Sequence, residues 1–141
     1  MSEQAKDLVR RFVNDVLAGG NLAAADEILT ENFIIRLPGL PPIEGREAFK
    51  DGLTEWQQAF PDWQISIEEL IAEGDRVAGR WRCPGTHRGP LMGIAPTGRR
   101  VSWTANDIFR IEADRIAENT AEEDIAGLLR QLGASHQATP A

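Results

Sequence analysis

The chain of 141 residues and 15.5 kDa has the size of one domain with one hydrophobic core. Its content of 42% hydrophobic and 26% charged residues is ordinary for a globular protein, which excludes a collagen-like, coiled-coil or wholly disordered chain. The 15 Lys and Arg against 22 Asp and Glu leave a net charge of −7, so nucleic acid is not an expected partner.

Cysteine and histidine content argues against disulfides and structural zinc. Cys83 is the single cysteine, and only His87 and His136 provide imidazoles. The charged segment 1–7 lacks the apolar stretch of a secretory signal, and no run approaches the ~20 apolar residues of a membrane span. We therefore expect a cytoplasmic protein that binds no metal and enters no membrane.

The first thirty residues predict two packed helices. Between Leu8 and Leu17, apolar residues recur at three- and four-residue steps, as on one face of an amphipathic helix. Gly19-Gly20 should end this helix, because glycine adopts a left-handed C-cap at little cost. Asn21 can then cap a shorter helix that ends at Leu29.

A strand and a third helix are expected next. The short β-branched run Phe33–Leu37 stops at Pro38 and predicts a strand. From Gly45 to Phe60 the apolar residues again have helical spacing, and Pro61 closes the segment.

The second half of the chain predicts an antiparallel sheet. Alternation begins at Trp63, and Gly74-Asp75 and Ala113-Asp114 have the composition of hairpin turns. The expected strands cover 63–68, 77–83 and 99–112, with a last strand after 114, and the loop 85–98 separates two of them. Thr120 and Glu123 have capping-box spacing ahead of a C-terminal helix.

This order of elements predicts the α+β class, with helices packed on the concave face of a curved antiparallel sheet. A sheet covered on one side forms a cone with an internal pocket, the usual place for a small ligand. We expect a single domain over residues 1–133 and a frayed tail over 134–141. The long outer face of the sheet carries apolar residues that would be exposed in a monomer, so we predict a homodimer.

Seven segments, in order, resemble the SnoaL-like polyketide cyclase (ester cyclase) family, within the group that shares the nuclear-transport-factor-two-like cone fold. They are Ile43–Phe49, Ala59–Asp62, Gly74–Ala78, Gly85–His87, Gly93–Arg99, Asp107–Ile111 and Leu128–Gly133. The resemblance extends from Leu8 to Gly133. It implies an aldol-type ring closure of a small or medium apolar carbonyl compound, without metal or organic cofactor, by a pocket carboxylate that acts as acid and base.

The same fold group leaves other functions open. One alternative is a module that binds a small ligand without turnover, which should tolerate loss of its pocket acid. Another is a ketosteroid-isomerase-like or epoxide-hydrolase-like enzyme. Epoxide hydrolysis needs an acid, an amide and an arginine that position water, and the sequence does not assemble such a set.

Asp107 is the first candidate for catalysis, by proton abstraction from the substrate with His87 assisting. On the expected strand it is the one acid on an otherwise apolar face, between Trp103 and Phe109. Desolvation there would raise its pKa and make it a usable base or acid near neutral pH. The structural alternative is an aspartate held by backbone or arginine partners.

His87 and Glu118 are the other polar candidates. His87 lies in the segment that matches the family and could relay a proton or stabilise an oxyanion, or else bond the backbone of its loop. Glu118 could be a second pocket acid, although a cross-strand ion pair explains it as well. Among the aromatic residues, Trp81, Trp103 and Phe109 are the expected pocket walls, because their flat rings suit an apolar substrate.

Overall fold

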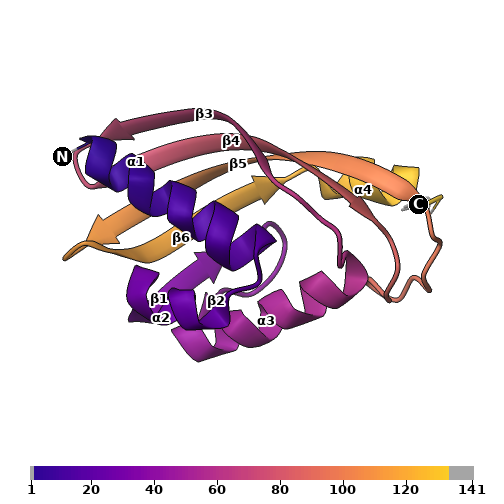
Figure 1. The fold of residues 1–141 in the computed structure, drawn as a ribbon. Coiled ribbons are helices and arrows are strands. Elements are labelled where there is room, and N and C mark those ends of the chain that lie inside the picture. The colour runs from indigo at the N-terminus through magenta and orange to yellow at the C-terminus, as the bar shows by residue number, and fades with distance from the viewer. Residues whose placement is uncertain (1, 134–141) are drawn as a thin grey trace.

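The computed structural model describes residues 2–133, which form helices on one side of a six-stranded sheet (Figure 1). The helical segments are α1 (Ser2–Arg11), the π-helical η1 (Phe12–Ala18), α2 (Leu22–Ile28), α3 (Arg46–Ala59) and α4 (Ile125–Gln131). The strands are β1 (Leu29–Arg36), β2 (Ile43–Glu44), β3 (Ser66–Glu73), β4 (Arg76–Thr86), β5 (Arg100–Glu112) and β6 (Arg115–Glu123).

The helices at the start of the chain are confirmed. α1 continues into η1 and buries Phe12, Val13 and Val16 completely, which is the apolar face that the spacing predicts. Gly20 has a φ of 69°, the left-handed conformation in which only glycine is unstrained. The side chain of Asn21 accepts a hydrogen bond of 3.0 Å from the backbone N–H of Ala24 and caps α2.

The sheet has the strand order β2-β1-β6-β5-β4-β3, in which β3 to β6 form an antiparallel meander. β1 lies parallel to β6, so the sheet is mixed, and the two-residue strand β2 has no counterpart in the sequence prediction. β1 begins at Leu29 rather than at Phe33, because Leu29 already pairs with Ile116 of β6. Pairing in the sheet here outweighs the low strand propensity of Glu31 and Asn32, which lie between Leu29 and Phe33.

Two boundaries differ further from the prediction. β3 begins at Ser66, because Trp63 turns inward and its indole Nε1–H donates to the Leu17 carbonyl at 3.2 Å. The expected capping box of Thr120 and Glu123 is wrong, since both residues belong to β6. Asp124 caps α4 instead and accepts a hydrogen bond of 2.9 Å from the backbone N–H of Gly127.

The α+β class and the covered concave face are confirmed. α1 contacts β3 and β4, while α3 packs on β1 (Figure 1). Along β5 the inward residues from Val101 to Phe109 alternate with outward ones, as the period of two predicts. No helix among residues 2–133 is long and apolar enough to cross a membrane. The expected tail, 134–141, lies outside the described residues.

Candidate active site

A pocket of about 740 Å³ lies between the helices and the concave face of the sheet. Most of its wall is apolar, as in sites for small apolar ligands. Leu40 and Met92 line it and are nevertheless 58% and 54% exposed, so the loops that carry them lie at its opening. The polar or ionisable lining side chains other than tryptophan are Glu55, Cys83, Asp107, Asn119, Glu123 and Asp124.

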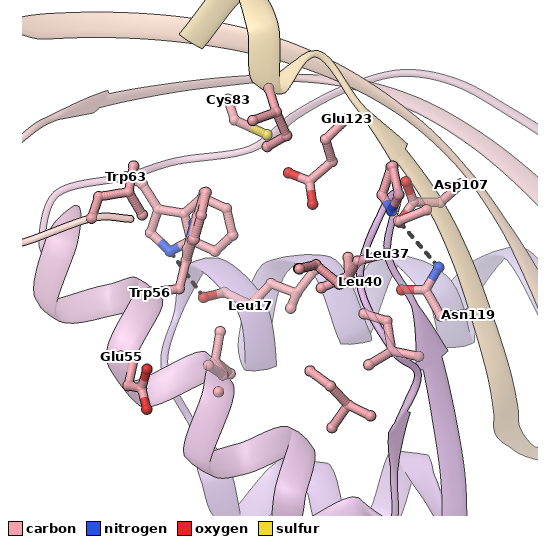
Figure 2. Close-up of a pocket in the computed structure, with 18 of the residues that line it drawn as sticks. Leu17, Leu37, Leu40, Glu55, Trp56, Trp63, Cys83, Asp107, Asn119 and Glu123 are labelled. Carbon is pink, nitrogen blue, oxygen red and sulfur yellow. Dashed lines mark hydrogen bonds between the residues drawn. The ribbon is translucent and has the colours of Figure 1, made fainter. Parts of the chain in front are cut away.

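Asp107 is buried in the pocket wall with 6% of its surface exposed. Its Oδ2 accepts a hydrogen bond of 3.0 Å from Nδ2 of Asn119 (Figure 2), while Oδ1 has no partner in the described part of the chain. Burial, with a smaller contribution from the charge of Glu123, raises the pKa of Asp107 to about 8, against the lowering effect of the Asn119 bond. The carboxyl can therefore exchange a proton near neutral pH through a free oxygen.

Asn119 and Glu123 are pocket residues that the sequence analysis missed. In the β5–β6 hairpin Arg110 pairs with Glu118 but Ile111 pairs with Ile116, so Ala117 is an extra residue in a β-bulge. The bulge reverses the alternation of β6 beyond this point, which turns Asn119 and Glu123 toward the pocket. Alternation along the sequence alone places Glu118 on the inner face, and no turn residue marks the bulge.

Glu118 is consequently not in the pocket. It forms ion pairs of 2.8 Å with Arg36 and 2.9 Å with Arg110, the cross-strand arrangement that was its alternative interpretation. Hydrogen bonds from Arg110 and then from Arg36 hold the pKa of Glu118 below its usual value. Its role is confined to the outer face of the sheet.

His87 does not meet Asp107. Its backbone N–H bonds the carbonyl of Arg99, eight residues before Asp107 on the neighbouring strand, which corresponds to roughly 26 Å of strand. The ring is fully buried against Phe60, and its Nδ1 lies 3.0 Å from Oγ1 of Thr97. The hypothesis of a relay between His87 and Asp107 is wrong, because the histidine anchors its own loop.

The predicted aromatic walls divide into two groups. Trp81 lines the pocket, whereas Trp103 and Phe109 lie in the core behind it. Phe109 packs against Trp81 with ring centroids 5.8 Å apart and therefore supports the wall from behind. Trp56, one of the apolar residues at helical spacing between Gly45 and Phe60, lines the pocket, and its buried Nε1–H has no hydrogen-bond partner among residues 2–133.

Glu123 lies near the pocket end of β6 and is half-buried. Its Oε1 accepts a hydrogen bond of 3.2 Å from Nε1 of Trp103, and burial raises its pKa. Cys83 lies nearby (Figure 2), and burial first, then the charges of Glu123 and Asp107, raises the pKa of its thiol. The thiol thus stays protonated and is a poor nucleophile.

These side chains can transfer protons but are not arranged to hold a metal. Within residues 2–133, no three His, Cys, Asp or Glu side chains converge in a possible metal site. The pocket instead combines two carboxyl groups of raised pKa with the donors of Asn119 and Trp56. Such a set suits acid–base chemistry on an apolar carbonyl compound.

Comparison with known proteins agrees with this geometry. The family model for SnoaL-like polyketide cyclases matches residues 7–132. Aklanonic acid methyl ester cyclase DauD of Streptomyces sp. (strain C5) is 34% identical over 90% of this chain and 80% of its own. The corresponding enzyme DnrD of Streptomyces peucetius is 33% identical over 90% and 89%. The structure of TsrD from Streptomyces laurentii, 29% identical, superimposes with a TM-score of 0.85 over 96% and 98%.

Proposed function

The chain belongs to the SnoaL-like polyketide cyclase family, and from this premise we propose that it is a cofactor-independent cyclase that closes a carbon ring by an intramolecular aldol reaction. The observation that carries the proposal is the buried carboxyl of Asp107. It has one oxygen tied to Asn119 and one without a partner, in the wall of an apolar pocket. A positioned carboxyl of this kind is the minimal requirement for general acid–base catalysis.

The chemistry follows from the protonation state of Asp107. An aldol closure forms a bond between a carbon that loses a proton and a carbonyl carbon whose oxygen gains one. With a pKa of about 8, Asp107 is mostly protonated at pH 7 and can donate to the carbonyl oxygen as the new bond forms. The sequence analysis assigned the opposite step, proton abstraction, to this residue.

The charge of the pocket supports a neutral substrate. Among the residues that the structure describes, the lining includes four acidic side chains but no lysine, arginine or histidine, so a free carboxylate would enter without a counter-ion. The relatives DauD and DnrD are named for a methyl ester, in which the charge of the acid is masked. We therefore extend the proposal to an uncharged polyketide ester with a flat apolar body.

Asp107→Asn tests this function. The purified protein is incubated with aklanonic acid methyl ester, and the cyclised product is separated and quantified. The variant should lose at least ~10²-fold in turnover, the scale of a general acid–base group, and keep its affinity, because the amide preserves the shape. Asp114→Asn, in the exposed turn of the same hairpin, is the matched control and should retain the wild-type rate. Unchanged turnover in Asp107→Asn would refute the role of this residue.

A homodimer through the outer face of the sheet is part of the same proposal. Ile71, Ala78 and Ile108 are paired across three neighbouring strands, and the two isoleucines are 58% and 51% exposed. A second copy of the chain, related to the first by a two-fold axis, would cover these three side chains. Sedimentation of the wild type and of Ile108→Lys tests it: the wild type should be a dimer and the variant a monomer. A wild-type monomer independent of concentration at micromolar protein would exclude the dimer.

A further inference from the structure

Ring closure requires a base as well as an acid. The substrate carbon must lose a proton before or while it attacks, and a protonated Asp107 cannot accept it. His87, the expected assistant, lies far along the sheet, and the thiol of Cys83 is held protonated by burial. The base must therefore be sought among the remaining polar groups of the pocket.

Glu123 has the position that this role requires. Asp107 pairs with Ala121 on β6, and Glu123 is two residues further along β6, so the two acids are diagonal neighbours on one face of the sheet. Side chains in this relation are separated by roughly 7 Å at their Cα atoms, so both carboxyl groups can reach one substrate in the pocket. Figure 2 shows both side chains at the pocket, with the oxygens of Glu123 directed into it.

Trp103 holds Glu123 in place without fixing its charge. The indole is stacked on Trp63 at 6.0 Å and packed on Phe60 at 4.9 Å, so its Nε1–H has a fixed direction. It donates to Oε1 of Glu123, and no hydrogen bond or salt bridge within residues 2–133 engages Oε2. A neutral donor, unlike an arginine, leaves the carboxylate free to accept a proton.

We propose that Glu123 is the catalytic base of the pocket: its free oxygen takes the proton from the substrate carbon while Asp107 donates its proton to the carbonyl oxygen. The carbon–hydrogen bond breaks, its electron pair forms the carbon–carbon bond, and the carbonyl π pair becomes the new O–H bond. The step ends with Glu123 protonated and Asp107 ionised, and one proton passed through solvent restores the pair. This inference rests on the cyclase function proposed above.

The surrounding charges support this order of ionisation. The other titratable side chains that line the pocket are Cys83 of β4, Glu55 of α3 and Asp124 at the start of α4, and no lysine, arginine or histidine among residues 2–133 lines it. Negative charge on Glu123 raises the pKa of Asp107, so ionisation of the first acid keeps the second protonated. Burial raises the pKa of Glu123 as well, and the proposal places the one proton of the resting pair on Asp107.

Glu123→Gln separates the base from the acid, because the amide oxygen can still accept from Trp103. The first measurement is ring closure of aklanonic acid methyl ester. The second is hydrogen–deuterium exchange in D₂O at the substrate carbon that loses its proton. It uses the same ester after reduction of the carbonyl that this carbon attacks, so that no ring can close.

We expect Glu123→Gln to lose at least ~10²-fold in both measurements. Asp107→Asn should lose ring closure but retain exchange. Glu122→Gln, the adjacent exposed residue on the other face, should match the wild type.

Three outcomes decide between the possibilities. Exchange and ring closure in Glu123→Gln within threefold of the wild type would overturn the role of Glu123. A wild type that closes no ring would refute the cyclase function itself. The pH profile of the wild type needs no variant: the rate should rise as Glu123 ionises and fall as Asp107 loses its proton near pH 8. A rate that continues to rise through pH 8 would make Asp107 the base and overturn the proposal.

Discussion

Asp107→Asn should make the free energy of unfolding less dependent on pH. In the folded protein burial raises the pKa of Asp107 from 3.8 to about 8, whereas in the unfolded chain the carboxyl returns to its ordinary value. Between these two values the native state binds one proton more than the unfolded state. The wild type therefore loses stability as pH rises across this window, and the loss ends above the folded pKa. An amide at this position has no proton to lose.

The magnitude follows from linkage. One proton of difference corresponds to about 1.4 kcal/mol per pH unit. The unfolding free energy of Asp107→Asn, measured relative to that of the wild type, should therefore increase by roughly 4 kcal/mol between pH 5 and pH 8. The hydrogen bond from Asn119 remains possible, because the new amide oxygen can accept it. Acids whose pKa is lowered in the fold, such as Asp62 and Glu118, contribute to the free energy of unfolding with the opposite pH dependence. Their contribution is the same in the variant and in the wild type, so it cancels when the two proteins are compared.

Urea unfolding of both proteins at pH 5, 6, 7 and 8 measures this difference without any substrate. Asp114→Asn controls for the loss of one acid from the exposed surface and should follow the wild type. A difference between Asp107→Asn and the wild type that stays constant over this range would show that Asp107 is ionised in the native state. The burial argument, and with it the role of Asp107 as proton donor, would then be wrong.

Three further predictions concern metals, the cap of α4 and the pocket indole. Incubation with EDTA should leave the rate of ring closure unchanged, because the described residues provide no metal-ligand cluster, and a loss restored by one divalent ion would contradict this. Asp124→Ala should lower the unfolding free energy by about 1 kcal/mol, measured in urea, since the N-cap bond to Gly127 is lost. Trp56→Phe should weaken ligand affinity up to about tenfold in a titration, because its indole N–H has no hydrogen-bond partner among residues 2–133 and is available to a ligand. An affinity equal to that of the wild type would show that this N–H does not reach the ligand.

Local patterns predicted much of the fold. The period of two along β5 placed Asp107 on the buried face, and the three-and-four spacing located the first helix and its apolar side. These features depend on neighbours in sequence, so a single chain suffices to find them. Asn21 is a similar case, because capping involves residues only three positions apart.

The errors have a common origin in long-range pairing. A bulge at Ala117 exists only because β6 is matched to β5, and it exchanges Glu118 for Asn119 and Glu123 in the pocket. His87 was assigned to catalysis from its residue type and its place in a segment that resembles the family, but the length of β4 and β5 separates it from Asp107. Neither a register shift nor the distance along a strand can be deduced from the composition of one segment.

The tryptophans around the pocket provide an internal optical probe. Trp56, Trp63 and Trp103 lie with ring centroids 5.4 to 6.0 Å apart, and the chain contains no tyrosine. Their ultraviolet transitions should couple and give a strong near-ultraviolet circular dichroism signal. Because Trp56 lines the pocket and Trp103 bonds Glu123, occupancy and protonation should both alter the emission. Ligand entry can thus be followed in real time without a label.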